Sequence, residues 1–193
     1  MKSLCVFCAA RSGAQAPRVD HARAVGRGLA ERGIRVVFGG GKNGLMGALA
    51  DGALEAGGDV IGVLPRSLAE VELAHPGVAD LRVVDSMHER KTRMHELSDG
   101  FVALHGGLGT FEELLESLTW LQLGFHGKPV GVLDPDGFYA PLFALLDGAT
   151  AAGFVSQDHR GNLLTAASLE ELLERFRAFR APGSLVDRVR ELS

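Results

Sequence analysis

The chain alternates short, almost uninterrupted apolar runs with longer segments of helical periodicity, and this alternation constrains its fold most strongly. Continuous rather than alternating apolar residues are typical of parallel strands that are covered on both faces. The pattern predicts strands over Ser3–Ala9, Ile34–Phe38, Asp59–Leu64, Leu81–Asp85, Phe101–Leu104, Val130–Leu133 and Leu163–Ala166.

The segments between these runs carry apolar residues at the helical period. They predict helices over Ala16–Arg32, Leu45–Ala56, Met87–Ser98, Thr110–Leu123, Tyr139–Ala152 and Leu169–Arg180. This order of elements predicts an α/β fold, a mostly parallel open sheet of about six or seven strands flanked by helices. We expect a single domain over residues 1–180 and a C-terminal tail over 181–193, which begins near Pro182 and Gly183.

Bulk properties exclude several classes of protein. The 193 residues carry a formal charge of −4, whereas a nucleic-acid binder should be basic. No apolar run reaches the roughly 18 residues of a membrane span. We therefore expect a cytoplasmic protein that binds neither nucleic acid nor a membrane.

Cys5 and Cys8 form a C-x-x-C within a predicted strand. Residues three apart on a strand face opposite ways, so we interpret both as core residues.

A first glycine-rich junction, FGGGKNGLMG, follows the second predicted strand. Gly39, Gly41 and Gly44 match the G-x-G-x-x-G of dinucleotide sites. The acid that should end the next strand is missing, because Asp59 begins that strand. Lys42 is followed by Asn43, which excludes a P-loop. We therefore expect a tight turn whose backbone approaches a nucleotide, rather than an NAD site.

A second junction, HGGLGTFEE, follows the strand that ends at Leu104. Its glycines allow an anion to approach the N–H groups at the start of the next helix, which suits a phosphate. Thr110 and Glu113 also fit a capping box, in which each side chain satisfies the other's backbone N–H. A capping box does not require three glycines, so the pattern favours a ligand.

The charged segment SMHERKTRMHELSDG lies between these junctions. Such a run is commonly a solvated helix face. Here Met87 and Met94 add an apolar side, and Arg90 and Lys91 bring positive charge near a strand end. The histidines lack the spacing of a zinc helix, so we expect no metal.

Together, GGGKNGLMGALADGALEAGG, SMHERK and GGLGTFEE resemble the LONELY GUY (LOG) family, whose members are often mislabelled lysine decarboxylases. The resemblance runs from about Leu4 to Phe179. It implies a Rossmann-like fold, a homodimer and no cofactor. It also implies hydrolysis of the N-glycosidic bond of a nucleoside 5′-monophosphate, either a cytokinin riboside monophosphate or AMP, to free base and ribose 5-phosphate.

The resemblance assigns residue roles where the motifs match. The catalytic arginine and glutamate fall on Arg90 and Glu113. The positions implied to bind substrate or its phosphate are Glu72, Lys91, Gly106, Gly107, Leu108, Gly109, Thr110, Phe111, Glu112 and Thr119. The sequence departs from the family pattern twice. His105 replaces a proline that normally starts the loop, and Ala9-Ala10 replaces a Gly-Ser pair.

Other functions remain to be separated from this one. A molybdenum-cofactor carrier of the same fold would share the glycine loops without needing the Arg/Glu pair. A pyridoxal-phosphate decarboxylase would need a Schiff-base lysine. The chain's lysines are Lys2, Lys42, Lys91 and Lys128, and none has a recognisable cofactor context.

Overall fold

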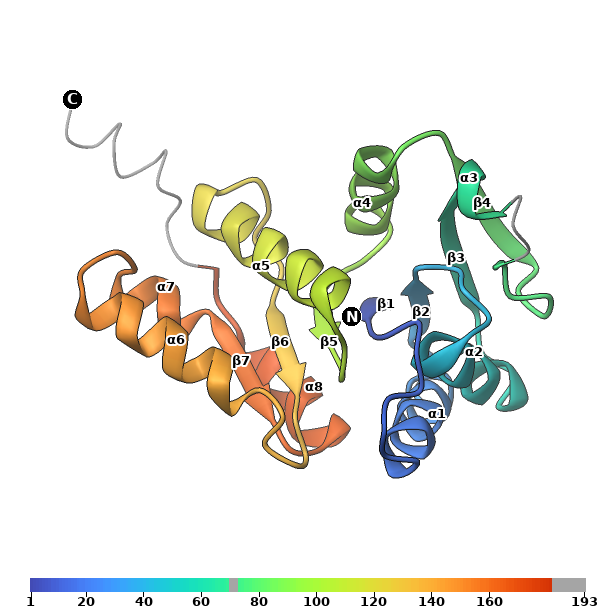
Figure 1. Ribbon diagram of the computed structural model, residues 1–193, viewed down its shortest axis with the longest axis horizontal. Helices are drawn as coiled ribbons and strands as arrows, with labels where there is room; N and C mark the ends of the chain where they lie inside the picture. Colours follow the sequence, from blue (N-terminus) through green and yellow to red (C-terminus); the bar gives the residue numbers. More distant parts are fainter. Residues whose placement is uncertain (70–72, 182–193) are drawn as a thin grey trace. The chain divides into compact units, whose positions relative to one another are not determined.

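The computed structural model describes residues 1–69 and 73–181 (Figure 1). It comprises two compact units, Met1–Glu113 and Leu114–Ser193, and the boundary between them falls inside helix α5, Leu108–Leu123. Residues 182–193, which make up nearly all of the predicted tail, lie outside the described part of the chain.

The first unit is built on a parallel sheet in the order β4-β3-β2-β1-β5. Its strands are β1 Ser3–Phe7, β2 Arg35–Phe38, β3 Val60–Pro65, β4 Asp80–Val84 and β5 Phe101–Ala103. Cys5 of β1 is in register with Val37 of β2 on one side and with Phe101 of β5 on the other. The chain thus builds outward from β1 to β4 and then returns to the opposite side of β1. Ligands bind at such a reversal of strand order, beyond the carboxyl ends of the strands.

Besides the start of α5, the described residues of this unit form the helices α1 Pro17–Ala30, α2 Gly44–Glu55, α3 Arg66–Ala69 and α4 Met87–Glu96. Helices α1 and α2 lie side by side (Figure 1). Glycines permit this close packing: a Cβ at Gly26 would lie 2.0 Å from the Leu49 carbonyl oxygen, and one at Gly52 would lie 2.0 Å from that of Arg23. Where they meet at the surface, Arg23 pairs with Asp51 and Glu55.

The described part of the second unit contains the rest of α5, two parallel strands and three further helices. These elements are β6 Val130–Leu133, α6 Ala140–Ala151, α7 Gln157–Gly161, β7 Leu163–Ala166 and α8 Leu169–Ala178. Leu172 and Phe176 of α8 pack on β6, where a Cβ at Gly131 would approach both to about 3 Å. After β6, the carboxylate of Asp134 accepts hydrogen bonds from the N–H groups of Phe138 and Tyr139.

The structure confirms the predicted α/β class and every predicted strand and helix, with ends that differ by a residue or two. Helices α3 and α7 were not predicted, and both are short. Cys5 and Cys8 are free and buried, as expected for core residues. Burial is the main reason that the pKa of each thiol is raised. Within the described residues, no helix has both the length and the apolarity that a membrane span needs.

Candidate active site

Arg90 lies in the second turn of α4 and is buried. The helix begins after Ser86, whose hydroxyl accepts from the Glu89 N–H. The Arg90 Nε donates to the carbonyl oxygen of Val63 on β3 at 3.0 Å. Its Nη1 donates to Oε1 of Glu113 at 2.8 Å. The charged segment is therefore not a uniformly solvated face, because it holds a cation at the carboxyl edge of the sheet.

Glu113, the partner of Arg90, is equally buried: each side chain is 10 % exposed. Burial raises the pKa of the Glu113 carboxyl, an effect that the Arg90 guanidinium opposes and the neighbouring Glu112 reinforces. Burial disfavours the charged form of a carboxyl, so the group accepts a proton more readily than an exposed glutamate does. A carboxylate whose pKa is raised by burial is better suited to act as a general base than an exposed one.

A second ion pair lies beside the first. The Lys91 Nζ donates to Oε1 of Glu112 at 2.5 Å. The Lys91 side chain is 11 % exposed, whereas that of Glu112 is 53 % exposed. Consecutive cations on α4 thus face consecutive carboxylates on α5. Glu112 can exchange its partner for solvent or ligand more readily than Glu113 can.

The glycine loop, residues 106–110, comprises the end of the β5–α5 connection and the first turn of α5, and it leaves an open edge next to these charges. A Cβ at Gly107 or Gly109 would meet nothing within 4 Å, and Leu108 is 87 % exposed. The first N–H groups of an α-helix have no acceptor within the helix and favour an anion. The buried side chain of Thr110 lies over Gly106, where an added Cβ would lie 2.0 Å from Thr110 Oγ1. The loop therefore has the backbone access that a phosphate needs.

The capping-box interpretation of this loop is not what the structure shows. Helix α5 begins at Leu108, so Thr110 lies within the first turn rather than at the residue before it. The Glu113 carboxylate bonds to Arg90. Thr110 and Glu113 thus serve other contacts than a reciprocal helix cap.

The first glycine-rich junction differs from the second, because protein atoms already occupy its helix start. The N–H groups of Leu45 and Met46 donate to the carbonyl oxygen of Ala9 at 3.0 and 3.2 Å. Asp59, at the amino end of β3, pairs with Arg35. The groups that would bind a dinucleotide pyrophosphate and ribose are therefore either engaged or at the wrong edge of the sheet.

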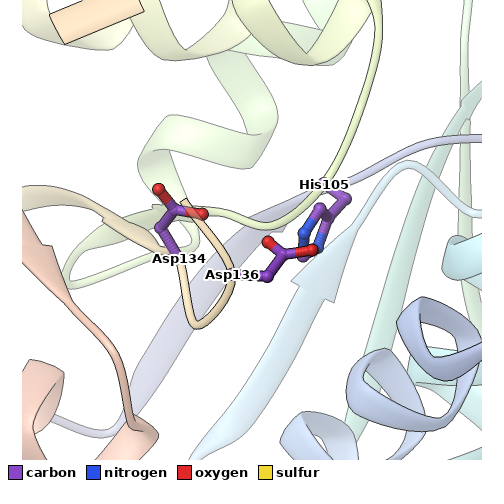
Figure 2. A group of neighbouring side chains, drawn as sticks. All are labelled: His105, Asp134 and Asp136. Atoms are coloured by element: carbon purple, nitrogen blue, oxygen red, sulfur yellow. The ribbon is translucent and has the colours of Figure 1, made fainter. Parts of the chain in front are cut away.

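His105, which replaces the family's proline, is 4 % exposed. Its carbonyl oxygen accepts from the Ala9 N–H at 3.1 Å, and its ring meets that of His21 edge-on, 6.1 Å between centroids. Figure 2 shows this side chain after β5, and Asp134 and Asp136 after β6. The replacement therefore puts a buried imidazole, rather than an exposed one, at the start of the glycine loop.

The structure does not test two of the predicted substrate contacts against this group. Glu72 falls outside the described residues. Thr119 belongs to the second unit, and its hydroxyl donates to the Leu115 carbonyl of its own helix at 2.7 Å. Sequence reasoning missed the Val63 carbonyl, since a backbone acceptor leaves no signature in residue identity.

Comparison with known proteins identifies the family. The sequence model described as "Possible lysine decarboxylase" matches residues 46–176. Probable cytokinin riboside 5′-monophosphate phosphoribohydrolase LOGL1 of Oryza sativa subsp. japonica is 46 % identical over 176 residues, 91 % of this chain and 79 % of the relative. The chain belongs to the LOG family. A second LOG relative, cytokinin riboside 5′-monophosphate phosphoribohydrolase LOG2 of Arabidopsis thaliana, is 43 % identical over 90 % of this chain and 81 % of its own length.

Solved structures confirm the fold of this LOG-family chain. The molybdenum cofactor carrier protein of Chlamydomonas reinhardtii is 23 % identical, with a TM-score of 0.69 over 92 % of this chain and 98 % of its own. The molybdenum cofactor binding protein of Rippkaea orientalis is also 23 % identical, with a TM-score of 0.67 over 91 % of this chain and 94 % of its own. At this identity the likeness establishes the shared fold alone.

Proposed function

We propose that this chain hydrolyses the N-glycosidic bond of nucleoside 5′-monophosphates, releasing the free base and ribose 5-phosphate. The observation that carries the proposal is the buried Arg90–Glu113 pair beside an open glycine loop, in a chain 46 % identical to a probable phosphoribohydrolase. The names of the LOG relatives suggest cytokinin riboside monophosphates as substrates, and AMP is the unmodified analogue to test with them.

The reaction breaks the bond between the ribose anomeric carbon and a base nitrogen. The bonding electrons leave with the base, and the sugar gains oxocarbenium character. Glu113 stabilises that positive charge and accepts a proton from the attacking water, whose oxygen bonds to the anomeric carbon. The proton ends on the departing base nitrogen. The raised pKa of Glu113 suits it to this transfer.

Arg90 has two tasks in this scheme. It holds the Glu113 carboxylate in place, and its positive charge stabilises negative charge on the phosphate, the ribose hydroxyls or the leaving base. Two buried hydrogen bonds fix the guanidinium before substrate arrives. A fixed charge costs no reorganisation during the reaction, which is the basis of electrostatic catalysis.

The 5′-phosphate binds at the glycine loop and the start of α5. The open backbone at Gly107 and Gly109, the nearby Thr110 and the cation of Lys91 supply complementary partners. Binding energy from the phosphate then orients the sugar on Glu113. The proposal therefore requires a strong preference for monophosphates over nucleosides.

We further expect a cytoplasmic homodimer. The first unit exposes apolar side chains at Val83, Met87 and Leu108, which a second copy would cover. Size-exclusion chromatography with light scattering should give about twice the 20.4 kDa of the chain. A monomer mass at micromolar concentration would refute the dimer but would not bear on the proposed activity.

A product assay tests the activity. Purified chain is incubated with AMP, CMP, GMP and isoprenylated AMP, and with the matching nucleosides, and the products are separated by chromatography. The proposal predicts equal amounts of base and ribose 5-phosphate from at least one monophosphate, and far less from its nucleoside. Nucleotide that binds and is recovered intact from every incubation would instead support a non-catalytic carrier.

A further inference from the structure

The first glycine-rich junction lies directly against Arg90. An alanine Cβ at position 39 would lie 2.1 Å from Arg90 Nη2 and 3.4 Å from Cζ. The other two guanidinium nitrogens are engaged, Nε with the Val63 carbonyl and Nη1 with Glu113. All three nitrogens of the group therefore have a close neighbour, and on the Nη2 side that neighbour is Gly39.

Position 39 requires glycine because there is no space for a side chain, and not because the backbone conformation is unusual. Gly40 and Gly44 have φ of 76° and 61°, where residues with a side chain are strained. Gly39 is not among the glycines with positive φ. Its φ therefore does not call for a glycine, yet a real Cβ does not approach another heavy atom to 2.1 Å.

The loop that carries Gly39 is held from several sides. The Gly40 carbonyl accepts from the His75 N–H, and the Lys42 N–H donates to the Leu73 carbonyl, both at 2.9 Å. A Cβ at Gly40 would already press on Leu64 and Leu81 at 3.2 Å. The backbone has little room to retreat, so added volume at position 39 displaces the Arg90 guanidinium instead.

We propose that Gly39 is a positioning residue for the hydrolytic reaction, which seats the Arg90 guanidinium so that it meets Glu113. The inference rests on the proposed function for its effect on activity. The carbonyl oxygen of Ala9 already accepts hydrogen bonds from N–H groups at the start of α2, so that helix start is not open to a phosphate. Seating Arg90 gives the first glycine motif a different role.

Gly41 offers a matched control on the same loop. Its φ is not positive, and an added Cβ would meet Met46 Cε at 2.9 Å. Gly39 shares this neighbour, because its Cβ would lie 3.0 Å from Met46 Sδ. At Gly41 the next nearest atoms are Met46 Sδ at 3.6 Å and the Leu73 carbonyl oxygen at 3.9 Å. Both alanine variants therefore disturb Met46, and Gly39→Ala alone collides with Arg90.

The kinetic test compares the two variants on the monophosphate that the wild type hydrolyses best. Gly39→Ala should lower kcat by on the order of 100-fold, as a misplacement of about 1 Å can. Gly41→Ala should keep kcat within about threefold of the wild type. In an Arg90→Lys background, Gly39→Ala should add no further loss, because the colliding nitrogen is gone. Equal losses in the two alanine variants, or losses that multiply in the double variant, would overturn the inference.

A measurement without substrate separates this inference from the proposed function. In ¹⁵N spectra of the arginine side chains, the Arg90 Nε–H signal is assigned by its disappearance in Arg90→Lys. It should persist in Gly41→Ala and shift or broaden in Gly39→Ala. An unchanged signal in Gly39→Ala would overturn the inference, even if the wild type proved inactive. If Gly39→Ala does not fold, Gly39→Ala/Arg90→Lys should restore folding, and failure to restore it would count equally against the inference.

Discussion

Arg90 and Glu113 share a buried hydrogen bond of 2.8 Å, although they come from different helices and lie 23 residues apart in the chain. Removing two opposite charges from water is costly, and a buried ion pair often adds little net stability. Each partner nevertheless depends on the other, since either one alone would be an uncompensated buried charge. This mutual dependence keeps a carboxylate and a guanidinium at a fixed distance before substrate binds.

Activity and stability should respond to pH in opposite directions through Glu113. Its pKa is raised above the ordinary 4.5 by burial. The proposed reaction needs the carboxylate, so kcat should rise with pH through the raised value. The same shift means that the folded chain holds this proton more tightly than the unfolded chain does. Its contribution to stability is therefore complete below about pH 4.5 and is lost as pH rises through the folded pKa.

Rate and melting temperature measured from pH 4 to pH 8 check this prediction. Subtracting the melting curve of Glu113→Gln isolates the contribution of Glu113. If kcat instead rises with pH below the pKa of an ordinary glutamate, the assignment of Glu113 as the base is contradicted.

The glycine loop gives a prediction for Gly106→Ala. The new Cβ would lie 2.0 Å from Thr110 Oγ1, so Thr110 must move out of its buried position. We expect a loss of stability of about 1–3 kcal/mol, as for overpacking, together with a weaker preference for monophosphate over nucleoside. Gly107→Ala has open space around its Cβ and should keep the wild-type melting temperature.

Comparing kcat/KM for the monophosphate and the nucleoside in both variants completes this test. If Gly107→Ala lowers the monophosphate activity at an unchanged melting temperature, position 107 lies where phosphate approaches the loop. Identical monophosphate preference in Gly106→Ala and the wild type would remove Thr110 from the phosphate site.

Lys91 and Glu112 should differ in their effect on substrate affinity. Lys91→Gln removes a largely buried cation next to the loop. A hydrogen bond to a charged group is worth about 1.5–3 kcal/mol, so KM for the monophosphate should rise by roughly tenfold to a hundredfold. Glu112→Gln keeps the Lys91 charge and should raise KM less. Equal changes in the two variants, for both monophosphate and nucleoside, would mean that the pair is structural only.

The order of strands and helices was predictable because both patterns are local. Continuous apolar runs mark buried parallel strands, and the helical period marks the segments between them. The start of α5 was misplaced by two residues for a physical reason. Gly109 lies inside the first turn, and glycine is a poor helix former, so the sequence points to Thr110 as the helix start.

The charged residues of the candidate site were predictable as far as residue identity indicates them. Arg90, Lys91, Glu112 and Glu113 were named from the motifs, and the structure pairs them two by two. The burial of Arg90 and Lys91 was not predictable, because a charged helical run usually faces solvent. The contact of Arg90 with Gly39 spans separate motifs and depends on packing, so residue patterns alone do not show it.

The most direct test of the account is Glu113→Gln, measured for nucleotide binding and for turnover on the same preparation. Glutamine preserves the shape of the side chain and can still accept a hydrogen bond from Arg90, whereas it cannot act as a base. Loss of general-base catalysis typically costs about 10²–10⁴-fold, so kcat should fall by at least about 100-fold while the variant remains folded and still binds monophosphate. Wild-type turnover in Glu113→Gln would contradict the central claim that this buried carboxylate carries the hydrolysis.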